Sequence, residues 1–230
     1  MEYANHLNEY APAWSAAQVD QEVTRIREAA KRNHNTDVYK MCYSAIDLTT
    51  LSCNDSVTSV TEFARKAAEF YQKYPHIPNV ASICIYPAFV ETVGLAVDGT
   101  PMRITSVGGG FPAAQTFLEV NALEVAMAVE NGADEIDIVL NVGRMLTGEY
   151  DEAAVVMCQA IRDYYEKTGR KVGFKAAGGV RTAEDGALYY TIVEEILGKE
   201  WLTTDLFRIG ASSAANNILS AIEGREIKYF

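Results

Sequence analysis

Three charged residues stand inside stretches that otherwise have the apolar character of buried strands: Asp47 in SAIDLT, Asp137 in EIDIVL and Lys175 in GFKAAG. An unpaired charge in a buried strand is strongly unfavourable, so such a residue is tolerated where it is paired or where it performs chemistry. A simple ion pair between the lysine and an aspartate is one interpretation. We favour an acid–base cluster, because an amine in a low-dielectric pocket has a lowered pKa and becomes a usable nucleophile.

Two glycine-containing turns follow strand-like runs and could bind an anion. The stretch KVGFKAAGGVRT leads from an apolar run through a glycine pair into a helix-like segment, and LFRIGASS repeats the pattern. Such turns offer backbone N–H groups beside the positive end of a helix dipole. Paired turns after two successive strands hold the substrate phosphate in many (β/α) barrels. The predicted phosphate-binding residues are Gly178, Gly179, Gly210, Ser212 and Ser213.

The elements that would position these residues alternate along the chain. Strand-like apolar runs occupy residues 42–48, 81–86, 103–107, 135–140, 172–176 and 206–209, and helical periodicity occupies residues 57–74, 112–131, 152–168 and 183–197. Continuous apolar strands separated by helices are typical of a parallel sheet. Residues 15–33 form an amphipathic pattern with Ser15 as N-cap, and we expect this helix to cover the bottom of the domain that follows.

Composition excludes several classes of protein. The chain has 230 residues, of which 49% are hydrophobic, which is enough for one large core. A formal charge of −11 disfavours binding to nucleic acid and to anionic membranes. We find no membrane span and no signal peptide pattern, so we expect a cytoplasmic protein.

The cysteines and histidines do not form a metal or disulfide pattern. Neither Cys-x-x-Cys spacing nor clustered histidines occur, which argues against a zinc site and against a disulfide framework. Cys84 is interpreted as a small core residue rather than a reactive thiol. The residues considered are Cys42, Cys53, Cys84 and Cys158, with His6, His34 and His76.

Taken together, several blocks resemble the deoxyribose-phosphate aldolase family. They are AIDLTTL (45–51), ASICIYP (81–87), VGGGFP (107–112), GADEIDIVLNVG (132–143), VGFKAAGGVRTAED (172–185) and LFRIGASS (206–213). The resemblance implies a (β/α)₈ barrel that cleaves 2-deoxyribose 5-phosphate into glyceraldehyde 3-phosphate and acetaldehyde, in deoxyribonucleotide catabolism. It implies a lysine Schiff base, and no metal or other cofactor.

Carried over to this sequence, the resemblance implies a role for each charged strand residue. Asp137 would be the carboxylate of a proton relay, Lys175 a second lysine that tunes the Schiff-base lysine, and Asp47 a supporting carboxylate. Gly178 and Gly179, with Ser212 and Ser213, would form the phosphate cradle. A neutral amine would attack the sugar carbonyl, and the iminium would accept the electron pair of the breaking C–C bond.

The sequence departs from the family after the fourth strand. The segment that carries the fifth and sixth strands, with the Schiff-base lysine in a motif close to FIKTSTGK, has no counterpart, because residues 147–152 run directly into AAVVM. A unit of such a barrel takes about 30 residues, so two absent units correspond to a gap of about 60 residues. We therefore expect a barrel-derived α/β fold with about six parallel strands. A helical extension (1–40) would precede an incomplete barrel domain (41–230).

Three functions follow from this pattern. The chain could be an aldolase in which Lys175 substitutes as the amine, a remnant that binds sugar phosphates without turning them over, or a destabilised fragment that self-associates through strand edges. The expected partner is a small-molecule sugar phosphate, and a homo-oligomer is left open. If the sheet closes with six strands, residues 135–140 lie beside residues 172–176, joined by one right-handed crossover.

Overall fold

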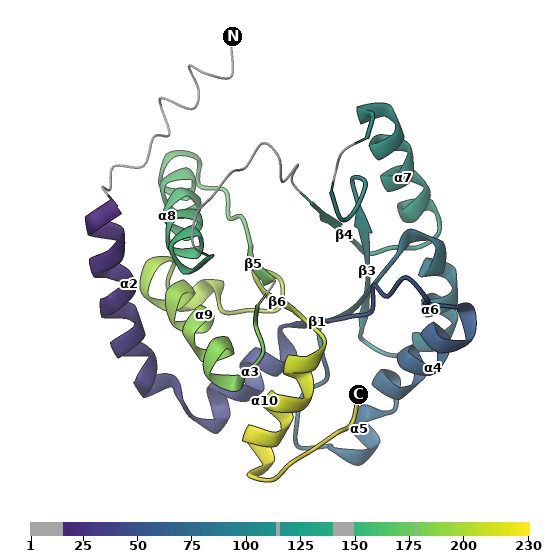
Figure 1. Cartoon of the computed structure of the whole chain (residues 1–230), viewed down its shortest axis with the longest axis horizontal. Helices are drawn as coiled ribbons and strands as arrows, with labels where there is room; N and C mark the ends of the chain where they lie inside the picture. The colour runs from purple at the N-terminus through teal and green to yellow at the C-terminus, as the bar shows by residue number, and fades with distance from the viewer. Residues whose placement is uncertain (1–15, 114–115, 140–149, 178) are drawn as a thin grey trace.

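The fold is built on one parallel sheet whose strands are ordered β4-β3-β2-β1-β6-β5. The computed structural model describes residues 16–113, 116–139, 150–177 and 179–230. Ser15, Gly178 and the junction at 147–149 lie outside this range. The strands are β1 (Ile46–Thr49), β2 (Ser82–Ile85), β3 (Arg103–Gly108), β4 (Glu135–Ile138), β5 (Phe174–Ala177) and β6 (Phe207–Ala211). The six predicted strand regions are therefore confirmed, and the sheet is curved with helices around its outer side (Figure 1).

The sheet does not close, so the expectation that residues 135–140 lie beside residues 172–176 is wrong. β4 and β5 are the two ends of the strand order, and neither pairs with the other. Strand number, tilt and stagger are coupled, and six strands leave little room inside a closed barrel. Here charged side chains occupy the concave side, where Lys175 of β5 and Asp137 of β4 form an ion pair across the gap between the two end strands.

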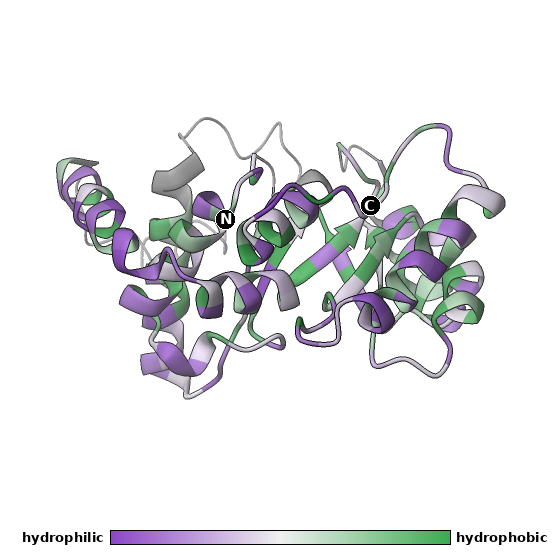
Figure 2. Ribbon diagram, turned by 90° about the horizontal axis from the view of Figure 1, so that it is seen from below, coloured by the Kyte–Doolittle hydropathy of each residue, from purple (hydrophilic) through white to green (hydrophobic). Residues whose placement is uncertain are grey.

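The strands alternate between polar and apolar residues rather than being apolar throughout. In β4 (EIDI) and β6 (FRIGA) every second residue is apolar, and successive side chains of a strand point to opposite faces. The polar residues of these two strands, Glu135, Asp137 and Arg208, face the concave side, where they form ion pairs. Figure 2 shows hydrophilic and hydrophobic positions succeeding one another along the strands.

The predicted helices are present, with adjusted ends. They are α2 (Ala16–Ala30), α4 (Val57–Ala68), α5 (Phe70–Lys73), α7 (Leu118–Glu130), α8 (Tyr150–Thr168) and α9 (Ala183–Ile196). Capping boxes at Ser56 and Thr182 set the starts of α4 and α9. Among the described residues, three further α-helices escaped prediction: α3 (Thr36–Ser44), α6 (Val90–Val97) and α10 (Ser213–Glu223).

Helix α3 corrects the first predicted strand. Residues 42–44 belong to this helix, and the strand begins only at Ile46. The Asn35 side chain accepts a hydrogen bond from the Val38 backbone N–H and thereby caps the start of α3. An N-cap in this position makes residues 36–44 a helix, although their apolar residues also suit a strand.

Helix α2 packs on two helices of the domain that follows it. Its contacts are with α8 and α9. Arg25 pairs with Glu195 of α9 at 2.6 Å, and the side-chain amide of Asn33 donates to the Thr191 hydroxyl at 2.9 Å. These polar contacts, added to the buried apolar residues Val19 and Ile26, fix α2 on the outside of the helical layer.

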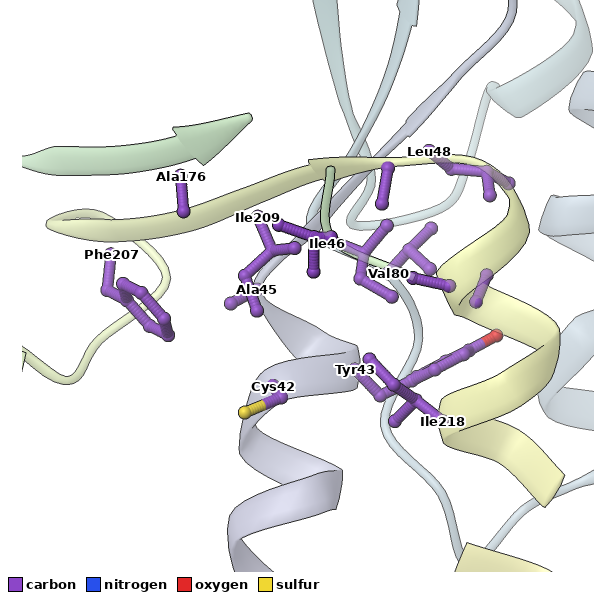
Figure 3. Close-up of a cluster of buried hydrophobic side chains, with 14 of the residues drawn as sticks. Cys42, Tyr43, Ala45, Ile46, Leu48, Val80, Ala176, Phe207, Ile209 and Ile218 are labelled. Atoms are coloured by element: carbon purple, nitrogen blue, oxygen red, sulfur yellow. The ribbon is translucent and has the colours of Figure 1, made fainter. Parts of the chain in front are cut away.

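The main core lies between the convex face of the sheet and the helices. Figure 3 shows the side chains of α3, β1, β6 and α10 meeting in one cluster, with Tyr43, Ile46, Ile209 and Ile218 all fully buried. Burial of large apolar side chains stabilises a fold by about 1.5–3 kcal/mol each. This layer makes the convex side of the sheet rigid and leaves the concave side for the charged residues.

Candidate active site

The three charged strand residues predicted from the sequence meet on the concave face. The Lys175 Nζ atom of β5 lies 2.5 Å from Asp137 Oδ2 of β4 and 2.9 Å from Asp47 Oδ2 of β1. Asp47 is 2% exposed, whereas Lys175 and Asp137 keep about a quarter of their side-chain surface. Because β4 and β5 are the ends of the sheet, this ion pair spans its open side.

A second cation, Arg208 of β6, completes the cluster and was missed by the sequence analysis. Its Nη1 atom lies 2.6 Å from Asp47 Oδ1 and 2.7 Å from Glu135 Oε2, and its Nη2 atom lies 2.6 Å from Glu135 Oε1. Its Nε atom donates to the Thr204 carbonyl oxygen. The buried Asp47 carboxylate is therefore shared by two cations, one on each oxygen.

Polar residues of β2 and β3 extend this network across the sheet. The Ser82 hydroxyl donates to Asp47 Oδ1 at 2.8 Å, and the Thr105 hydroxyl lies 2.8 Å from Ser82 Oγ and 3.1 Å from Glu135 Oε2. Arg103 pairs with Glu135 at 2.8 Å. The signal that could have found these residues is their alternation with apolar residues, which places them on one face.

The carboxylates keep Lys175 charged. Burial by itself lowers the pKa of this amine, but the charges of Asp47 and Asp137 outweigh that effect, and the pKa of Lys175 is raised. This direction is opposite to the one that a buried nucleophilic lysine needs. Burial raises the pKa of the neighbouring Cys84 thiol to about 11, which agrees with its interpretation as a core residue.

A cavity of about 320 Å³ opens beside the cluster, between the two end strands. Its walls include Asp47, Asp137, Lys175 and Arg208, with Ile138 and Phe174 among the apolar residues. A cavity of this volume can hold a small ligand. It gives solvent and small molecules access to the lysine amine.

The two predicted anion-binding turns lie next to each other. β5 and β6 pair in register up to Ala177 and Gly210, so the chain leaves both strands at the same edge of the sheet. Gly179 has φ +78°, a left-handed conformation that favours glycine. Ser212 precedes α10, which has no side-chain cap, and Ser213 is its first residue. Gly178 lies outside the described residues, so the complete cradle stays a prediction.

Gly210 has a second reason to be glycine. A Cβ atom at this position would lie 2.9 Å from Ala177 Cβ and 3.0 Å from Lys175 Cε. Contacts under 3.0 Å are essentially never seen, so a larger residue would force β6 away from Ala177 of β5. Gly210 therefore allows the close approach of β5 and β6, in addition to its predicted role in phosphate binding.

Glu135 should make the free energy of unfolding depend on pH in the acidic range. Burial alone raises its pKa, but hydrogen bonds from Arg208 and Arg103 prevail, and the pKa of Glu135 is lowered. A carboxylate with a lowered pKa stabilises the fold above its unfolded pKa, and this contribution is lost as the pH falls through the folded value. We expect the free energy of unfolding to decline below about pH 5, and less steeply in Glu135→Gln. Urea titrations at successive pH values measure this, and equal slopes in both proteins would contradict it.

The described part of the chain offers neither a metal site nor a membrane-spanning helix. No group of three or more His, Cys, Asp or Glu residues in this part of the chain is arranged to hold a metal ion. Nor is any described helix long and apolar enough to cross a membrane.

The fold and the site define a class: a (β/α) half-barrel with a lysine–carboxylate cluster on its concave face. No protein-family model matches the sequence. Deoxyribose-phosphate aldolase of Mus musculus is 35% identical over 249 residues, covering 75% of this chain and 77% of the relative. A putative deoxyribose-phosphate aldolase of Caenorhabditis elegans is 32% identical, covering 89% of this chain and 88% of the relative. The chain belongs to the deoxyribose-phosphate aldolase family.

Solved structures show the same fold. The apo form of a putative deoxyribose-phosphate aldolase from Toxoplasma gondii has a TM-score of 0.67 at 16% identity, over 82% of this chain and 98% of the other. A tetrameric deoxyribose phosphate aldolase from Aeropyrum pernix has a TM-score of 0.52 at 19% identity, over 90% of this chain and 98% of the other. Identities this low support the fold alone.

Proposed function

We propose that this chain binds a small sugar phosphate, of the kind that deoxyribose-phosphate aldolases cleave, and that its own aldolase activity is weak or absent. The observation that carries the proposal is the position of Lys175, which is 2.5 Å from one carboxylate and 2.9 Å from another. The paired turns at the ends of β5 and β6 would hold the phosphate of the ligand, and its sugar would lie toward Lys175.

Phosphate binding is supported by the arrangement of backbone N–H groups. In the capping box of α9, the Asp185 carboxylate already accepts from the Arg181 and Thr182 backbone N–H groups. An anion at the first turn must therefore use the preceding glycine pair. At the second turn, the start of α10 lacks a side-chain cap, so its first N–H groups and the positive end of its dipole could serve an anion.

Aldol cleavage requires an amine that is neutral when it attacks. The amine nitrogen bonds to the sugar carbonyl carbon and water leaves, and the resulting iminium takes up the electron pair of the breaking C–C bond. A proton then returns to the enamine carbon from a relay group. Lys175 is the lysine that lines the described cavity, and its two carboxylate partners hold it as an ammonium ion without a free electron pair.

We infer that the segment bearing the Schiff-base lysine of the family is absent from this chain. β4 and β5 are the two ends of the strand order and do not pair with each other, which supports this inference. The alignment with the mouse relative also supports it. That alignment has 249 positions, more than 75% of the 230 residues of this chain can occupy, so part of the relative has no counterpart here. The remaining residues can bind and orient a phosphorylated sugar, while the amine that would react with it is missing.

Phosphate binding is tested by titrating inorganic phosphate and then 2-deoxyribose 5-phosphate into the isotopically labelled protein. Backbone amides donate to the anion whether or not a reactive lysine exists, so we expect saturable shifts at Gly179 and Ser212. The amide of Ala30 in α2 is the control and should not move. Unchanged signals at both turns up to high millimolar phosphate would contradict the proposal.

Gly179→Ala provides a matched variant. No atom lies within 4 Å of the added Cβ, so the change acts through the left-handed backbone rather than through a clash. We expect a severalfold weaker phosphate affinity with a stability loss of about 1 kcal/mol. Gly132→Ala is its control, since Gly132 has φ +101° and an equally open Cβ position, but lies before β4. Equal weakening by both variants would count against a site at the turn.

A further inference from the structure

The side chains of Lys175 and Arg208 start next to each other on the concave face. The two residues are Cα partners in the register of β5 and β6, and partners in neighbouring parallel strands project to the same face. Two adjacent cations repel each other and therefore need an anion between them. The Asp47 carboxylate lies there, with Oδ2 at 2.9 Å from Lys175 Nζ and Oδ1 at 2.6 Å from Arg208 Nη1.

These contacts belong to a chain of alternating charges that crosses the sheet. It runs from Asp137 through Lys175, Asp47 and Arg208 to Glu135, and the successive N to O distances are 2.5, 2.9, 2.6 and 2.6 Å. Each cation lies between two carboxylates, and the central carboxylate lies between two cations. A change of charge at one member of such a network alters the interactions of the next.

We propose that Arg208 is a positioning residue for Lys175 and that it acts through the carboxylate that the two cations share. The Arg208 guanidinium and the Ser82 hydroxyl both donate to Asp47 Oδ1, which leaves Oδ2 for the amine. Arg208 also offsets part of the negative charge of Asp47, so that Asp47 holds the Lys175 ammonium ion less tightly. Glu135 opposes this effect, because it accepts from both terminal nitrogens of the guanidinium.

Burial makes this coupling strong at its centre and weak at its outer end. The side chains of Asp47 and Arg208 are 2% and 9% exposed, so water and salt screen their charges little. Arg103, which also pairs with Glu135, is 44% exposed. We therefore expect Lys175 to respond to the loss of Arg208 or Glu135, and hardly to the loss of Arg103.

The titratable groups around the Lys175 amine come from three other strands. They are Asp47 of β1, Asp137 of β4 and Cys84 of β2. Burial raises the pKa of the Cys84 thiol to about 11, so this group stays mostly neutral between pH 8 and 10. In that range the two carboxylates and Arg208 keep their charges, and a change in the reactivity of the amine reports on the contacts between them.

The reactivity of Lys175 is measured by labelling the full chain with acetic anhydride between pH 8 and 10, followed by mass spectrometry of the digested protein. Acylation requires a neutral amine, and the exposed Lys199 in the same digest is the internal standard. In Arg208→Met the labelling of Lys175 relative to Lys199 should fall roughly tenfold at each pH, which corresponds to a pKa raised by about one unit. A merely structural role predicts the opposite sign, because a destabilised chain opens more often and exposes the amine. An unchanged or faster rate would overturn the proposal.

Glu135→Gln tests the same coupling with the opposite sign, and it decides the question even if Arg208→Met does not fold. Without this carboxylate Arg208 interacts more strongly with Asp47, so the labelling of Lys175 should rise about threefold. Arg103→Met is the matched control, since Arg103 pairs with the same Glu135 on the exposed side, and it should change the rate by less than about 1.5-fold. Equal rates in Glu135→Gln and the unmodified chain, or an equal rise in Arg103→Met, would contradict the coupling. No ligand is added in these measurements, so this inference and the proposed phosphate binding can fail separately.

Discussion

Replacing Arg208 by methionine should lower the free energy of unfolding by about 3 kcal/mol, because it removes one of the two cations on the buried Asp47 carboxylate and leaves Glu135 with the exposed Arg103. The Arg208 side chain is 9% exposed and pairs with Asp47, which is 2% exposed, and with Glu135. Methionine fills a similar volume, so the loss reports on the charges rather than on a void. Urea unfolding at neutral pH, followed by circular dichroism, measures the change.

Arg103→Met is the matched control. Arg103 stands on the same face and pairs with the same Glu135, but its side chain is 44% exposed. Exposed ion pairs contribute little, so we expect a loss below about 1 kcal/mol. The loss of stability caused by Arg208→Met should also be smaller in an Asp47→Asn background, because an uncharged amide then replaces the Asp47 carboxylate. Equal losses in the two arginine variants would mean that burial of the pair is not the cause.

The six strand regions and the three central charges could be predicted because both are local features of the sequence. A charge within an apolar strand can be recognised from the sequence alone, and parallel strands bring such positions together. Arg208 and Glu135 were not recognised, although both lay inside predicted strand regions. Interpreting the strands as continuously apolar hid the alternation in FRIGA and EIDI that places these residues beside Asp47.

Two other features depended on tertiary structure. The apolar residues of 42–48 suit a helix end and a strand equally, and the N-cap at Asn35 decides between them. The sequence could not show whether residues 135–140 pair with residues 172–176. The segment between them is long enough for a crossover, but a long enough segment permits pairing without requiring it. In the structure the two strands stand at opposite ends of the strand order, and the Lys175 side chain of one reaches the Asp137 side chain of the other.

Turnover of 2-deoxyribose 5-phosphate by this chain should be at least about a thousandfold below that of the mouse relative, the scale on which enzymes lose activity with their nucleophile. Borohydride added with substrate near neutral pH should leave Lys175 unmodified, because its two carboxylate partners raise its pKa and keep the amine protonated. Mass spectrometry of the digested protein locates any adduct. Turnover comparable to that of the relative, and lost in Lys175→Leu but not in the exposed Lys199→Leu, would contradict this prediction.

The Asp137→Asn variant shows whether the carboxylates cause the low reactivity. Asparagine keeps the size of the side chain but removes the charge 2.5 Å from the lysine amine. Burial, which lowers the pKa of Lys175, then faces one carboxylate instead of two. The neutral fraction of the amine should rise roughly tenfold at a fixed pH between 8 and 10, so the adduct on Lys175 should form at lower pH than in the unmodified chain. An identical pH dependence in both proteins would mean that access to the cavity, rather than protonation, limits the reaction.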